Sequence, residues 1–109
     1  MLGVCRYPAQ AGVVVRNPAV RACDVLVAES GRTIAHVSFP QSVAGEYVRR
    51  APKTAISFTR RADSNPSATA ATVEFSGMAA LPAGALSVVS AVCVDRTGNP
   101  VADPQLSLE

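Results

Sequence analysis

The stretch TAISFTR, residues 54–60, carries the pattern on which the fold class depends. Its two large apolar side chains, Ile56 and Phe58, alternate with small or polar ones. Because successive side chains of a β-strand point to opposite faces, this alternation predicts a strand with one face in a core and the other in solvent.

The same period of two recurs on both sides of this stretch, in short segments bounded by Gly, Pro, Asn, Asp and Ser. The strands expected from it are 13–15, 23–29, 33–39, 54–60, 69–75, 86–94 and 101–108, and a weaker pattern adds a short strand near Tyr47. Helical periodicity competes only over residues 76–85, where two glycines and a proline favour a loop. About seven short strands with turns at this spacing predict an all-β sandwich or barrel.

The pattern also predicts which side chains face the core. Residues 33–39 are expected to turn Ala35 and Val37 inward and His36 outward. Residues 86–94 are apolar on both faces, which is typical of a central strand covered on both sides.

Length and composition allow one domain. The chain has 109 residues, is 49% hydrophobic and 17% charged, and is therefore too apolar for a disordered protein. No run approaches the ~18 apolar residues of a membrane span. We expect a loose N-terminal tail over residues 1–11 and a single β-sandwich domain over residues 12–109, in which Leu108 and Glu109 are typical of residues left by a cloning site.

Three motifs near the C-terminus carry a family resemblance. They are SGM at 76–78, LPAG at 81–84 and AVCVDRTGN at 91–99. Together they resemble the "Gly-Leu-x-Pro-Gly-Thr" loop and the "Ala-Val-Asp-x-x-Gly-Asn" strand end of fibronectin type III and related bacterial immunoglobulin-like modules. The resemblance covers residues 73–108 and implies a mainly antiparallel, immunoglobulin-like sandwich. Such sandwiches serve as spacers, adhesins and binding modules.

The cysteines are Cys5, Cys23 and Cys93, an odd number that forbids complete internal pairing. Immunoglobulin domains bridge a second and a late strand across a comparable length of chain. The resemblance therefore implies a Cys23–Cys93 disulfide if the chain is extracellular. In the cytoplasm both would be small buried thiols.

One segment points toward a ligand. Residues 49–61 contain five basic side chains and no acid, namely Arg49, Arg50, Lys53, Arg60 and Arg61. They could bind a polyanion such as nucleic acid, lipid headgroups or acidic glycans. Alternatively, the charges protect a sheet edge from self-association, which is the favoured interpretation.

Other candidate chemistry is sparse. His36 is the single histidine, and no Cys-x-x-Cys or His-x-x-x-His spacing suggests a metal site. Asp95, Asn99 and Asp103 lack the ligand spacing of a calcium loop and are expected to be solvated turn residues. No glycine-rich phosphate loop occurs, so we expect no cofactor.

The sequence thus predicts a non-enzymatic module for structural display or protein–protein interaction, whose partner is another protein or the neighbouring domains of a longer chain. We expect it in the periplasm, at the cell surface or secreted, with the cytoplasm as the alternative. The main rival is a small binding subunit that holds an anionic ligand on residues 49–61. An enzyme built on a Ser–His–Asp arrangement around His36 is the third hypothesis.

Overall fold

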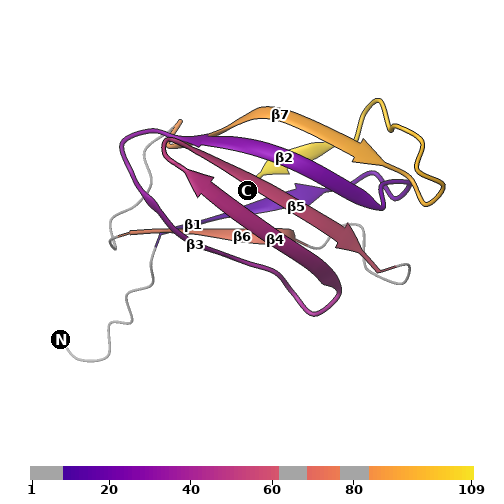
Figure 1. Ribbon diagram of the computed structural model, residues 1–109, viewed down its shortest axis with the longest axis horizontal. Coiled ribbons are helices and arrows are strands. Elements are labelled where there is room, and N and C mark those ends of the chain that lie inside the picture. Colours follow the sequence, from indigo (N-terminus) through magenta and orange to yellow (C-terminus); the bar gives the residue numbers. More distant parts are fainter. Residues whose placement is uncertain (1–8, 62–68, 77–83) are drawn as a thin grey trace.

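The structure, a computed structural model, describes residues 9–61, 69–76 and 84–109. These residues contain no helix and form two antiparallel sheets of four strands each (Figure 1). Sheet A has the order β3-β6-β1-β8, and sheet B has the order β4-β5-β2-β7. The strands are β1 (Gln10–Val15), β2 (Ala22–Glu29), β3 (Ile34–Ser38), β4 (Val43–Arg50), β5 (Lys53–Arg60), β6 (Thr69–Phe75), β7 (Leu86–Val94) and β8 (Leu106–Leu108). The all-β sandwich prediction is confirmed, with eight described strands.

The core lies between the two sheets and consists mainly of valine, with few aromatic rings. The period of two correctly predicts the inner faces of β2, β5 and β6, where residues such as Val27, Ile56 and Val73 are fully buried. β-branched side chains pack well on a pleated surface, which explains why this composition forms strands.

The predicted inward direction of Ala35 is wrong. The register of β3 against β6 shifts between Ile34 and His36, so that one residue is inserted into the alternation. Ile34 and Val37 are buried, whereas Ala35 is exposed. A β-bulge of this kind cannot be read from the period of two because it depends on the partner strand.

Strand β4 is longer than the short strand expected near Tyr47. It has eight residues and forms a hairpin with β5 across a cis Ala51–Pro52 peptide bond. The sequence predicts this strand only weakly, because its inward-facing positions hold Gly45 and Tyr47 instead of β-branched residues. A Cβ atom at Gly45 would lie 2.4 Å from the Phe39 ring, so a larger residue there would displace this ring.

The prediction that residues 86–94 form a central, doubly covered strand is also wrong. β7 is an edge strand that pairs only with β2 among the described strands, and Figure 1 shows it along the outer margin of the molecule. Six consecutive residues, 87–92, are exposed. His36 of β3 contacts Tyr47 of β4, which places β8 on the same side of the sandwich as β7. Sheet A therefore ends there in a three-residue strand, too short to cover the nine residues of β7.

The strand order shares part of the immunoglobulin arrangement and departs from it in two places. The neighbours β4-β5-β2 and β3-β6 correspond to strands D-E-B and C-F of that fold. However, β1 pairs with β6, where the immunoglobulin sandwich has its last strand, and β7 pairs with β2, where it has its first.

Both ends of the described chain meet in sheet A. β1 begins at Gln10, inside the segment expected to be a tail, and Gln10 pairs with Glu74. Leu108 pairs with Val13, and Glu109 continues the ladder through backbone hydrogen bonds to Gly12. Residues 1–8 and most of the predicted loop at 76–85 lie outside the described residues. Residues 62–67, where the run Asp-Ser-Asn-Pro predicts a turn, also lie outside them.

Candidate functional site

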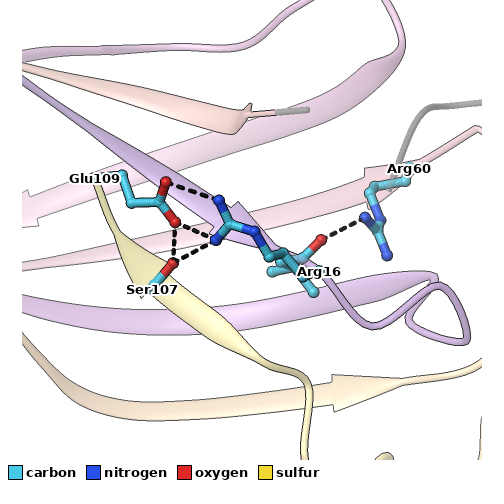
Figure 2. A network of polar contacts seen from close by, with 5 residues as sticks. Arg16, Arg60, Ser107 and Glu109 are labelled. Carbon is cyan, nitrogen blue, oxygen red and sulfur yellow. Dashed lines mark hydrogen bonds and ion pairs between the residues drawn. The ribbon is translucent and has the colours of Figure 1, made fainter. Parts of the chain in front are cut away.

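Arg60 of the basic segment lies inside the sandwich and is 4% exposed. It follows Phe58 on the inner face of β5, at the end where the chain crosses from β1 to β2. Its guanidinium donates hydrogen bonds to the carbonyl oxygens of Val15 at 2.9 Å, Asn17 at 2.9 Å and Val20 at 2.7 Å. Figure 2 shows Arg60 donating to a backbone carbonyl near Arg16. Burial lowers the pKa of this guanidinium, but its hydrogen bonds satisfy it within the fold.

Arg49 lies on the same face of sheet B at the opposite end. Its guanidinium nitrogen is 2.7 Å from Oε1 of Glu29, whose side chain is 6% exposed. The other oxygen of Glu29 accepts a hydrogen bond of 2.7 Å from the backbone N–H of Ile34. Arg49 therefore ties β4 to the β2–β3 connection.

Arg50 and Lys53 lie directly opposite each other across the β4–β5 hairpin, with both side chains exposed. Arg61 follows β5 and donates its backbone N–H to the carbonyl of Ser42. The five basic residues of the segment are thus dispersed over two ends and both faces of sheet B. Only Arg50 and Lys53 stand side by side toward solvent.

A second polar cluster, around Arg16, was missed by sequence reasoning. Arg16 forms an ion pair with Glu109 and donates a 3.1 Å hydrogen bond to Ser107 (Figure 2). The contact with Arg16, followed by a 2.6 Å hydrogen bond from the Ser107 hydroxyl, lowers the pKa of Glu109 to about 2, and the contact with Glu109 raises the pKa of Arg16. The cluster links the end of β1 to β8 through side-chain hydrogen bonds and an ion pair. No local pattern could reveal it, because its partners are 93 residues apart.

Cys23 and Cys93 form a disulfide, the pair that the resemblance implied. Both cysteines are 3% exposed. They lie directly opposite each other in β2 and β7, so the bridge joins neighbouring strands of sheet B. In antibody domains the corresponding bridge crosses the core between two sheets, and the position found here differs from that expectation.

The disulfide also shows which residues of β7 form backbone hydrogen bonds with β2 and which do not. Its Cα atoms are 4.1 Å apart, which is the short spacing of a non-hydrogen-bonded antiparallel pair. Backbone polar groups of Cys93 therefore point away from β2, and its carbonyl accepts a 2.9 Å bond from Val101 N–H. The hydrogen-bonding pattern of an antiparallel ladder repeats every two residues, so Ala91 opposite Val25 is also a non-hydrogen-bonded pair. The N–H and C=O of Ala91 therefore point away from β2, toward the uncovered edge.

His36 is exposed on β3. Its Nδ1 lies 3.1 Å from the Tyr47 hydroxyl, and the two rings meet edge to face. Within the described residues, the hydrogen-bond partner of the His36 ring is therefore a tyrosine.

Asp95 organises the turn after β7. Its carboxylate accepts hydrogen bonds from the N–H and hydroxyl of Thr97 and from the N–H of Asn99, and these bonds lower its pKa. The positive φ of Gly98, 86°, completes the predicted turn. In the described part of the chain, no three His, Cys, Asp or Glu side chains gather in a way that could hold a metal ion.

Comparisons of this chain with protein families, with curated proteins and with solved structures found no match. Within the residues that the structure describes, there is no helix of the length and apolarity needed to cross a membrane.

Proposed function

We propose that this chain is an exported, non-enzymatic β-sandwich module of the immunoglobulin-like kind, and that it binds another protein through the edge of β7. The shared neighbours β4-β5-β2 and β3-β6, together with the motifs of residues 73–108, support the immunoglobulin-like assignment. A role in display or interaction is supported by the bonds that Arg60, Arg49 and the two cysteines form within the fold.

The observation that carries this proposal is the character of β7. It has nine residues, none of them charged, and six in succession are exposed. Natural edge strands usually carry charges or are short, because an open ladder invites pairing with another chain. The opposite edge of sheet B follows this rule, since β4 carries Glu46, Arg49 and Arg50. A long uncharged edge instead suits the addition of an extended segment from a partner.

The disulfide supports export. Disulfides persist in oxidising compartments and are rare in the cytosol, where thiols are kept reduced. The Cys23–Cys93 bridge holds the proposed binding strand to its only described neighbour, β2. An oxidising location would therefore keep the binding edge in place.

The alternative, an anionic ligand on residues 49–61, rests on fewer residues than the sequence suggested. Arg60 is buried and Arg49 is paired with Glu29, which leaves the Arg50–Lys53 pair as its strongest support. Two neighbouring charges bind a polyanion weakly at physiological salt.

The edge proposal is tested by selecting random peptides displayed on phage against the immobilised module. Selected peptides should protect the amide proton of Ala91 from exchange, because this group points to the open part of the edge. Ala91→Pro removes one such donor without touching the ladder to β2 and should abolish binding. Ala91→Ser keeps the N–H and should bind normally.

Circular dichroism and an intact disulfide must show that the proline variant folds. If it does not, Ala91→Lys places a charge on the same edge and should also abolish binding. Failure to enrich any peptide would refute the proposal. So would peptides that bind equally to the proline and lysine variants or that protect amides elsewhere.

A further inference from the structure

The outer face of sheet B, which points away from the core, is organised in rows that run across its four strands. Register places Val48 of β4, Ala55 of β5, Leu26 of β2 and Ser90 of β7 side by side. This middle row carries no charge and has two branched apolar side chains, of which Val48 is 59% exposed.

The two rows that flank the middle row carry opposite charges. On one side, Glu46 and Asp24 lie in a row that ends at Val92 of β7. On the other side, Arg50 and Lys53 lie next to each other. Each row is two residues from the middle one, about 7 Å, so acidic and basic rows are about 13 Å apart.

Part of the exposed apolar surface lies on this face. In the described residues, four large hydrophobic side chains are exposed, and Val48 and Val92 (64%) point outward from sheet B. Val89, 50% exposed, is the extra residue at the β7 bulge beside the middle row. Glu46 and Arg50 make no ion pair with another described residue. The face therefore offers apolar surface and unpaired charge together.

We infer that this face binds a second copy of the chain, face to face about a two-fold axis. Two perpendicular directions of this axis pair the charge rows differently. With the axis parallel to the strands, the acidic row of one copy would lie over the acidic row of the other, and the basic row over the basic row, which is repulsive. With the axis along the middle row, the strands of the two copies run antiparallel, and Glu46 of each copy faces Arg50 of the other. Val48 and Leu26 then pack on their own counterparts. The charge rows select this second packing.

The size of the face indicates the strength of the association. Four strands of about eight residues cover about 19 Å by about 26 Å, or about 500 Å² per copy. Stable interfaces bury about 800 Å² per partner, so we expect a weak dimer that forms at high protein concentration and dissociates in salt. This inference rests on the interaction role proposed above and names a second copy of the chain as one partner. It uses the face of sheet B and leaves the edge of β7 open.

Sedimentation velocity over a range of concentrations at low salt tests the inference. The unaltered chain should dimerise, and added salt should weaken the dimer. Glu46→Lys places a lysine opposite Arg50 of the other copy, and Arg50→Glu places a glutamate opposite Glu46 of the other copy, so each variant should raise the dimer Kd about tenfold or more. Arg96→Glu, in the exposed turn after β7, is the matched control and should dimerise normally.

Mixing the two variants gives the decisive measurement. Each contact between a Glu46→Lys chain and an Arg50→Glu chain again joins opposite charges, so two monomeric proteins should form a heterodimer. The double variant Glu46→Lys/Arg50→Glu should likewise recover the homodimer.

A chain that stays monomeric at low salt would overturn the inference, as would a dimer whose Kd is unchanged by both charge reversals. A dimer lost in Ala91→Pro but kept in Glu46→Lys would show edge-to-edge pairing of β7 instead. The peptide selection described above remains independent of these outcomes, because a monomer can still bind a peptide along β7.

Discussion

Cys23 and Cys93 are neighbours within one sheet, with Cα atoms 4.1 Å apart, and do not bridge the two layers of the sandwich. This position has a mechanical consequence. β7 has one described neighbouring strand and little cover from sheet A, so its attachment to β2 depends on a single ladder and this covalent bond. The disulfide thus stabilises a strand of which six consecutive residues are exposed.

Removal of the disulfide should strongly destabilise the domain. The chain-entropy treatment gives about 4 kcal/mol for a loop closed between residues 70 apart, so Cys23→Ala/Cys93→Ala should lower the free energy of unfolding by about that amount. Urea denaturation measures the loss. Alkylation of the unreduced, denatured protein followed by mass analysis should label Cys5 alone. Three labelled cysteines in protein folded under oxidising conditions would contradict the bridge.

Arg60 should act as a structural residue. Arg60→Met removes the donors to the carbonyls of Val15, Asn17 and Val20, of which the Asn17 carbonyl keeps a hydrogen bond from Val20 N–H. The buried bonds to Val15 and Val20 are lost, at a cost of about 2–4 kcal/mol in unfolding free energy. Arg60→Lys should recover only part of the lost unfolding free energy, because a compact ammonium group cannot bond to several carbonyls as the planar guanidinium does. The exposed control Arg96→Met should change stability by less than about 0.5 kcal/mol. Equal effects of the two methionine variants would refute the role.

Retention on heparin should be weak. Only Arg50 and Lys53 of the basic segment stand side by side in solvent, so we expect elution below physiological ionic strength, roughly 0.15 M. Arg50→Glu should reduce retention further without unfolding the domain, and Arg96→Glu should reduce it less. Elution beyond roughly 0.3 M salt would favour the anion-binding alternative.

The Arg16–Glu109 contact predicts a pH dependence. The pKa of Glu109 is about 2 in the folded chain against an ordinary value of 4.5. Because the folded value is the lower one, the contact stabilises the fold above about pH 4.5, and this contribution is lost as the pH falls toward 2. NMR titration of the Glu109 side-chain carboxyl measures the midpoint. In Arg16→Gln the midpoint should return toward 4.5, and an unchanged midpoint would show that Arg16 is not the cause.

The sequence by itself determined the fold class and most of the core. In residues 23–29, 54–60 and 69–75 the period of two names the buried side chains correctly, because the alternation of a strand is a local property of its backbone. The turn at 95–100 was equally clear, since its Asp, Gly and Asn act on their own backbone within a few residues.

Only the tertiary structure decided which strands are neighbours, and with that the properties of the candidate site. An uncharged strand such as 86–94 has the same pattern whether two layers cover it or, as here, it stands exposed at an edge. Arg60 has the sequence character of a surface charge, yet carbonyls from residues 15–20 enclose it. Glu46 and Arg50 acquire their place in opposite rows only when β4, β5, β2 and β7 pair. Strand pairing joins residues far apart in the chain, so its outcome depends on the packing of the whole sandwich and not on any local pattern.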